Sequence, residues 1–307
     1  IWRMAYGHKA SAASELYATK RPPDASHMLV AICYREKHMT ADNTNGARRT
    51  AQVRVQRFNP DTDRKPYLQT FTVEVTQGMT LLDALHQIKT QHDGSLTYRR
   101  SCRHAICGSC AMSVNGHNML VCEQPLTDHL DGRGRVTIRP LAYLPIIKDL
   151  VVDRTSFWEQ YLRVKPWLIP PENIPEQEFR MSPEEVAALN NAEQCIMCGA
   201  CYSGCTVVAL NKKYIGPHAL LKAFMRVLDP RDSAPGDRLA GVDVTNGVWR
   251  CHTILNCIDA CPKHLDPTHA IETLRNLAQK RQAYEQARRE RQARLDQPIP
   301  QEEPSDV

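Results

Sequence analysis

The chain reads CIMCGACYSGC over residues 195–205 and CHTILNCIDACP over residues 251–262, and these two runs decide how its second half folds. The first run has the spacing C-x2-C-x2-C-x3-C, which is typical of chains that hold two iron–sulfur clusters. The second run ends in Cys-Pro, as that motif does, but Ile254 stands where its second cysteine is expected. In the first run Thr206 stands where the motif has proline. Together the runs offer seven thiols for two clusters.

The fourth cysteine of each such run binds the cluster of the other run. Crossing the runs in this way predicts a 4Fe–4S cluster held by Cys195, Cys198, Cys201 and Cys261. It also predicts a 3Fe–4S cluster held by Cys205, Cys251 and Cys257, because isoleucine cannot ligate a fourth iron. The alternative is that Ile254 marks a degraded site, although degradation usually removes more than one ligand position.

A third group of cysteines lies earlier, in SCRHAICGSC at residues 101–110 and at Cys122. The spacing C-x4-C-x2-C with a distant fourth cysteine is the plant-type 2Fe–2S arrangement. Zinc is the alternative, but zinc usually takes two close pairs of ligands. The predicted ligands of the 2Fe–2S cluster are Cys102, Cys107, Cys110 and Cys122. Eleven of the twelve cysteines are thereby assigned to iron, which implies a reducing compartment and leaves Cys33 as a spare thiol.

Residues 50–140 have the pattern of a small α+β domain. Apolar residues alternate around Val53 and again around Val73, on either side of a polar loop, which predicts a hairpin. Thr80 is a good N-cap for an apolar helical stripe. Asn115-Gly116 between two short apolar runs predicts a second hairpin, and a last strand is expected over residues 136–139.

The second half of the chain reads as a mostly helical domain. Residues 141–180 form a proline-rich linker in which residues 153–164 could be a helix. Ser182, Pro183 and Glu185 have the pattern of a capping box with proline at the first helical position. Two further helices are expected to start at Pro217 and Pro267, so that the helical domain covers residues 181–277.

The two ends of the chain differ from its middle. Residues 1–49 show no sustained period and contain eight Lys/Arg against four Asp/Glu, so we expect a disordered extension. Residues 278–307 form a charged tail, expected to be a solvated helix followed by a disordered end. Most of the net charge of +5 lies in the extension, so the middle of the chain is close to neutral. A nearly neutral middle argues against nucleic acid as a partner. No apolar run approaches the 18–20 residues or so that span a bilayer.

The chain resembles the iron–sulfur subunit of succinate dehydrogenase, which is respiratory complex II, and that of fumarate reductase. The likeness runs from about Val53 to Leu277. Its most specific segments are YRRSCRHAICGSCAMSVNG, RPLAYLPIIKDLVVD, CIMCGACYSGC, YIGPHALL and RCHTILNCIDACPKHLDP. The resemblance implies an N-terminal β-grasp ferredoxin fold followed by an all-helical two-cluster ferredoxin fold.

The resemblance also implies a function in electron transfer. Electrons from succinate would leave the FAD of a separate flavoprotein subunit, pass through the 2Fe–2S, 4Fe–4S and 3Fe–4S clusters, and reach a quinone beside one or two membrane-anchor subunits. The chain would have no succinate site of its own and would lie on the cytoplasmic face of the inner membrane, held there by the anchors. Two alternatives stay open: a menaquinol:fumarate reductase subunit, and a free ferredoxin-like carrier.

In the family, residues around the three-iron cluster help to form the quinone pocket. The matching positions here are His252, Ile254, Thr206 and Leu210. A histidine at position 252 could reach a quinone oxygen or relay a proton, or it could be a structural group that caps a cluster sulfur. Leu210 stands where ubiquinone-type enzymes have tryptophan, and Thr206 replaces the usual proline, so the quinone type and the physiological direction stay open.

Overall fold

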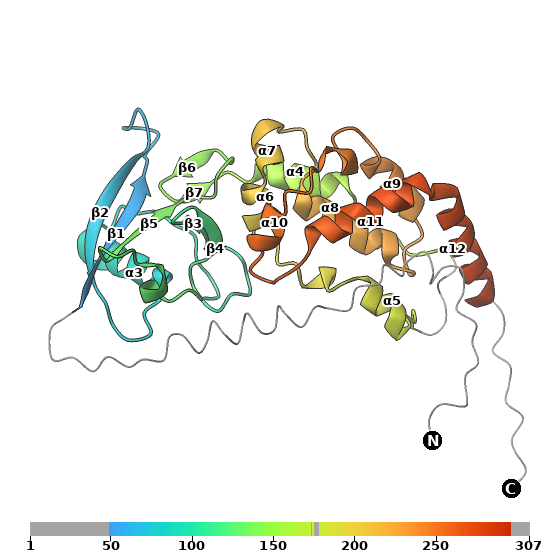
Figure 1. Cartoon of the computed structure of the whole chain (residues 1–307), viewed down its shortest axis with the longest axis horizontal. Helices are drawn as coiled ribbons and strands as arrows, with labels where there is room; N and C mark the ends of the chain where they lie inside the picture. The colour runs from blue at the N-terminus through green and yellow to red at the C-terminus, as the bar shows by residue number, and fades with distance from the viewer. Residues whose placement is uncertain (1–48, 173, 175–177, 296–307) are drawn as a thin grey trace, which may run out of the picture. The chain divides into compact units, whose positions relative to one another are not determined.

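The computed structural model describes residues 49–172, 174 and 178–295 (Figure 1). Residues 48–281 form one compact unit, whereas helix α12 (Arg281–Leu295) belongs almost wholly to another. The expected disorder of the N-terminal extension and of the extreme C-terminus, together with Cys33, lies outside the described residues. The expected helix in the charged tail is confirmed by α12.

A five-stranded sheet occupies the first part of the unit, with the strand order β2-β1-β5-β3-β4. Its strands are β1 (Thr50–Arg57), β2 (Tyr67–Glu74), β3 (Ala111–Val114), β4 (His117–Leu120) and β5 (Arg135–Arg139). Both predicted hairpins are confirmed: β1 pairs with β2 and β3 with β4, each antiparallel. The final strand β5 is parallel to β1 and antiparallel to β3, so it joins the two hairpins. Alternation buries Val53 and Val55 completely, as a half-buried strand requires.

Helix α3 (Leu81–Gln87) supplies the apolar layer under this sheet. The Thr80 hydroxyl accepts a hydrogen bond from the backbone N–H of Asp83, and the Asp83 carboxylate accepts one from the N–H of Thr80. This capping box satisfies donors at the helix start and confirms the predicted N-terminus. The helix continues into a π-helical turn (Ile88–His92), and its buried stripe is Leu81, Leu82, Ala84, Leu85 and Ile88.

The linker contains structure that the sequence did not predict. Strands β6 (Ile146–Lys148) and β7 (Val151–Val152) form a short hairpin, followed by the expected helix α4 (Thr155–Arg163). The turn of the hairpin is held by Asp149, whose buried carboxylate accepts hydrogen bonds from Arg57 Nε at 3.0 Å and from the backbone N–H of Thr97 at 2.8 Å. Because these partners are 92 and 52 residues away, local sequence patterns could not reveal the hairpin.

Helices make up the rest of the unit, around a central helix α8 (Pro217–Leu228) that is buried along almost its whole length. Around it lie α5 (Pro183–Ala188), α9 (Pro235–Val242) and α11 (Pro267–Gln279). The Ser182 capping box and the starts of α8 and α11 are confirmed. Three short helices were not predicted, because four or five residues are too few to show a period: α6 (Ala200–Gly204), α7 (Thr206–Leu210) and α10 (Asn256–Asp259). No described helix has the length and apolarity needed to cross a bilayer.

Candidate metal centres

The first cysteine group lies in a loop whose backbone turns toward the sulfurs. Arg103, Ala105 and Gly108 have positive φ angles of 63°, 60° and 69°. In this conformation the N–H groups of Ile106 and Cys107 both donate to Cys102 Sγ at 3.3 Å, and that of Ala105 donates to Cys122 Sγ at 3.3 Å. The loop therefore presents several donors to negatively charged sulfur, as metal-bound thiolates require.

The four thiols of this group sit in different environments. Cys110 and Cys122 are buried, whereas Cys107 is exposed. Burial and the neighbouring Cys122 thiol raise the pKa of Cys110 to about 12. At the other side of the group, backbone hydrogen bonds from His104 and Cys107 lower the pKa of Cys102 to about 6. Keeping Cys110 as a thiolate at neutral pH thus needs a bound cation, which a ligated iron supplies.

A second group surrounds a cavity in the helical part. Its wall contains Cys195, Cys198, Cys201 and Cys261, which are the four predicted ligands of the 4Fe–4S cluster. The other lining residues are mainly apolar, including Ile196, Leu221 and Pro262. Burial raises the pKa of Cys198 to about 11, so this cavity too disfavours free thiolates.

A third group surrounds a neighbouring cavity. Cys205, Cys251 and Cys257 line it, and burial raises the pKa of Cys257 to about 11. Thr206, His252 and Ile254 line the same cavity, as the sequence reading expects of residues near this cluster. Leu210 does not line it: this side chain lies at the end of α7 and is 88% exposed.

The three groups of cysteines follow one another closely in space. A Cβ built on Gly108, in the first loop, would lie 2.8 Å from the Cβ of Cys198 in the second group. Asn118 Nδ2 on β4 donates to the carbonyl of Ala200 at 3.0 Å, which ties the sheet to the same region. The second and third groups are joined by helix α6, which contains Cys201 and ends just before Cys205.

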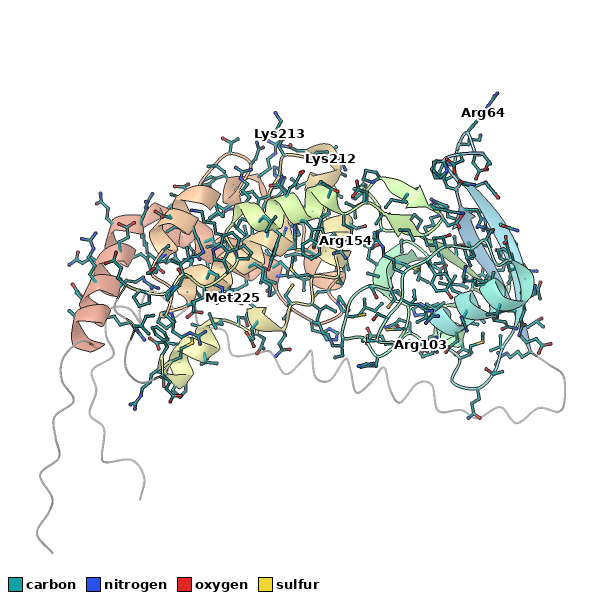
Figure 2. All side chains as sticks on the ribbon, turned by 180° about the vertical axis from the view of Figure 1, so that it is seen from behind. Arg64, Arg103, Arg154, Lys212, Lys213 and Met225 are labelled. Atoms are coloured by element: carbon teal, nitrogen blue, oxygen red, sulfur yellow. The ribbon has the colours of Figure 1, made fainter. Side chains whose placement is uncertain are left out.

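Arg154, which is labelled in Figure 2, lies beside the second group and was not predicted from the sequence. Its Nη2 group donates a hydrogen bond to the carbonyl of Met197 and lies 3.3 Å from where a Cβ of Gly199 would be. Arg154 thus lies close to both sequence neighbours of Cys198. The guanidinium lies over the Phe157 ring, 4.4 Å from the ring centroid. Burial lowers the pKa of Arg154, and the Cys198 thiolate opposes that effect. No spacing rule marks this residue, because its neighbours come from another part of the chain.

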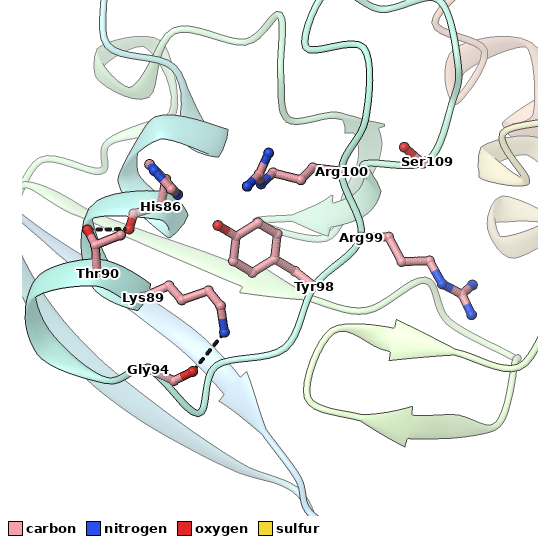
Figure 3. Close-up of a pocket in the computed structure, with 8 residues that line it drawn as sticks. All are labelled: His86, Lys89, Thr90, Gly94, Tyr98, Arg99, Arg100 and Ser109. Carbon is pink, nitrogen blue, oxygen red and sulfur yellow. Dashed lines mark hydrogen bonds between the residues drawn. The ribbon is translucent and has the colours of Figure 1, made fainter.

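A basic pocket of about 780 Å³ lies next to the first group (Figure 3). Its lining includes Ser109, which sits between two predicted ligands, and contains no carboxylate among the described residues. Arg100 points into the pocket, toward His86 and Tyr98, whereas Arg99 points away and donates to the carbonyl of Val152 at 3.1 Å. His86 Nδ1 and the Tyr98 hydroxyl are buried without a hydrogen-bond partner in the described structure. The pocket is therefore suited to an anionic group.

The residues present fit iron–sulfur clusters. Each group offers sulfur donors around a loop or cavity, and in each at least one backbone N–H donates to a sulfur. Among the described residues, no three His, Cys, Asp or Glu side chains are arranged to hold one single metal ion.

Comparison with known proteins places this geometry in a family. The sequence model of a 2Fe-2S iron-sulfur cluster binding domain matches residues 52–159, and that of a 4Fe-4S dicluster domain matches residues 191–265. The succinate dehydrogenase iron-sulfur subunit of Paracoccus denitrificans is 40% identical over 234 residues, which cover 76% of this chain and 89% of the relative. The chain belongs to the family of succinate dehydrogenase iron–sulfur subunits.

A second relative and a solved structure support this assignment. The succinate dehydrogenase iron-sulfur subunit of Coxiella burnetii (strain RSA 493 / Nine Mile phase I) is 42% identical over 224 residues, covering 72% of this chain and 94% of the relative. A chain of the Mycobacterium smegmatis Sdh1 complex, solved in the apo form, superposes with a TM-score of 0.69 at 28% identity, covering 77% of this chain and 98% of that one. The resemblance inferred from the cysteine motifs is thus confirmed, and so is the general architecture of a sheet followed by helices.

Proposed function

We propose that this chain is the electron-transfer subunit of a succinate:quinone oxidoreductase. It carries electrons one at a time from the FAD of a flavoprotein subunit to a membrane quinone. The observation that carries the proposal is the crossing of the two cysteine runs: each cavity is lined by cysteines from both runs. Such crossing is typical of two-cluster proteins, in which clusters a short distance apart exchange single electrons.

The ligand sets follow the three groups of thiols. Cys102, Cys107, Cys110 and Cys122 hold 2Fe–2S; Cys195, Cys198, Cys201 and Cys261 hold 4Fe–4S; Cys205, Cys251 and Cys257 hold 3Fe–4S. Support for the last comes from Ile254, which lines the third cavity and has no ligating atom. The clusters supply one-electron acceptors of graded potential, and this chain's contribution is to space them and to set their surroundings. The first set belongs to a β-grasp ferredoxin domain over residues 50–140, and the other two to a helical domain over residues 181–277.

The quinone binds at the third cavity, shared with membrane-anchor subunits that hold this chain peripherally at the cytoplasmic face. His252, Ile254 and Thr206 line this cavity, and Ile254 is half-exposed. His252 donates a hydrogen bond or a proton toward a quinone oxygen in this proposal. Leu210, which is exposed outside the cavity, contributes apolar surface on the anchor side. Because leucine stands there in place of the tryptophan of ubiquinone-type enzymes, a menaquinone and the reverse reaction, fumarate reduction, are the second candidate.

The flavoprotein subunit docks beside the basic pocket, because electrons must enter at the 2Fe–2S loop and Ser109 of that loop lines the pocket. An acidic side chain of the partner would pair with Arg100 and satisfy the buried Tyr98 hydroxyl. We expect Arg100→Glu to weaken co-purification of the flavoprotein at least tenfold, because a repelled charge replaces an attracted one. Arg64→Glu, on the exposed loop between β1 and β2, is the matched control and should bind normally (Figure 2).

Electron paramagnetic resonance of the complex, purified anaerobically from membranes, tests the proposal as a whole. We expect three cluster signals, including an oxidised 3Fe–4S signal, and about nine irons per chain, as the three cluster formulas require. Activity assays with ubiquinone and menaquinone analogues, run in both directions, then separate succinate oxidation from fumarate reduction. Purification of this chain as a soluble monomer with its clusters intact and no flavoprotein would favour a free carrier and contradict the proposal.

A further inference from the structure

The position of Arg154 is unfavourable for a cation on three counts. Its side chain is half-buried, and its Nε atom is fully buried without a hydrogen-bond partner in the described structure. It is the N-cap residue of α4, where the helix dipole presents positive charge. Another cation, Arg99, acts on it and lowers its pKa further. A charged group is retained in such a place only where an anion offsets these costs.

The available anion is the sulfur of the second group. Within the described residues Arg154 forms no ion pair with any carboxylate; its polar contact is with the backbone carbonyl of Met197. The two sequence neighbours of Cys198 are Met197, whose carbonyl accepts this hydrogen bond, and Gly199, where an added Cβ would lie 3.3 Å from Arg154 Nη2. Cys198 and Cys201 are the groups whose negative charge acts favourably on it. The guanidinium is held at this spot by the ring of Phe157, which in turn stacks on His218 at 3.9 Å.

We infer that Arg154 is the half-buried counter-ion of the 4Fe–4S cluster and sets that cluster's reduction potential. The inference rests on the proposed function, because the cluster must be there for the charge to act on it. A guanidinium is charged at every physiological pH, so its effect is constant rather than switched. Reduction adds one electron to the cluster and no atom, so the reduced form is the more negative one, and a fixed positive charge stabilises it. Arg154 thereby favours transfer of each electron that arrives from the 2Fe–2S side.

The stack of side chains behind Arg154 explains how the charge stays in place. Phe157 is fully buried and packs edge-on against Tyr202 of α6, the helix that joins the second and third groups. His218, on α8, donates a hydrogen bond from Nε2 to the carbonyl of Phe157 at 2.9 Å. Burial lowers the pKa of His218 to about 3, so this ring is neutral and does not repel the guanidinium. Arg154 therefore carries a fixed charge that a layer of uncharged aromatic side chains holds in place.

Potentiometric titration of the purified complex, followed by the EPR signals of all three clusters, tests the inference. Arg154→Gln keeps a hydrogen-bond donor but removes the charge, and Arg154→Lys keeps the charge. At a fixed potential near the midpoint we expect Arg154→Gln to lower the ratio of reduced to oxidised 4Fe–4S about tenfold, a shift of about 59 mV for one electron. Arg154→Lys should show little of this shift, with a midpoint close to that of wild type. Arg163→Met, which removes a charge from the exposed end of the same helix, should leave the midpoint unchanged.

The outcomes separate this inference from the proposed function. Equal midpoints for wild type and Arg154→Gln, or equal shifts in the Gln and Lys variants, would overturn the role of the charge while leaving the electron-transfer function standing. Absence of any 4Fe–4S signal from the wild-type complex would instead remove the proposed function. If Arg154→Gln fails to retain the 4Fe–4S cluster, the iron content of Arg154→Lys is measured instead. A cluster retained in Arg154→Lys supports a requirement for the charge, whereas a loss equal to that in Arg154→Gln overturns the requirement.

Discussion

Gly108 is the point where the first cysteine loop meets the second, and a single methyl group there tests how tightly the two are packed. The Cβ of Gly108→Ala would lie 2.8 Å from the Cβ and 2.9 Å from the Cα of Cys198. Ordinary contact begins at 3.4 Å, so the loops would have to separate by about 0.6 Å. Cys198 cannot easily move away, because it is a proposed ligand of the 4Fe–4S cluster and lies at the wall of its cavity.

Two costs add in this variant. Gly108 has φ +69°, where an L-residue loses about 1–2 kcal/mol. Overpacking against Cys198 adds about 1–3 kcal/mol. Gly134→Ala is the matched control, because Gly134 has φ +70° with no atom within 4 Å of an added Cβ. The control therefore carries the backbone strain without the clash.

Thermal unfolding of the two variants, compared at one scan rate with clusters intact, measures the difference. We expect Gly108→Ala to unfold roughly 2–12 °C below Gly134→Ala, as about 1–3 kcal/mol of extra destabilisation implies for a unit of this size. Magnetic interaction between the reduced 2Fe–2S and 4Fe–4S clusters should also weaken in Gly108→Ala alone. Equal midpoints in the two variants, with unchanged magnetic interaction, would refute the close approach of the two loops.

Two further predictions concern the third cavity and the sheet. Ile254→Cys places a thiol at the missing ligand position of the cavity, so the oxidised 3Fe–4S EPR signal should disappear and quinone reduction should slow; an unchanged spectrum would mean that the second run is aligned wrongly. The Ser95 hydroxyl and the Arg57 guanidinium lower the pKa of Asp93 from 3.8 to about 2. The stability that this shift contributes, screened by solvent to about 1 kcal/mol, is present above pH 3.8 and is lost as the pH falls toward 2. Asp93→Asn should therefore lower the thermal unfolding midpoint at neutral pH and make that midpoint fall less steeply as the pH is lowered. If the midpoint of the variant falls as steeply in acid as that of wild type, Asp93 is not the source of the pH dependence.

The spacing of cysteines determined much of the proposed site. Ligand type and short-range spacing are local properties, so the sequence predicted the three groups, and the structure brings the thiols of the second and third groups together in two cavities. The N-cap at Thr80, the capping box at Ser182 and the Asn115-Gly116 turn were predicted correctly for the same reason, because each is completed within four residues.

Tertiary structure alone decided the contacts between distant segments. The β6–β7 hairpin depends on the Asp149 carboxylate and its partner Arg57, 92 residues away, and so no local pattern announces it. Arg154 reaches Met197 across 43 residues, and Gly108 meets Cys198 only once the sheet and the helices have packed. Leu210 was expected near the third cavity but is turned to the surface by the short helix α7. A sequence specifies which groups can bind iron; the charges and close approaches that act on the bound iron arise from packing between residues far apart in the chain.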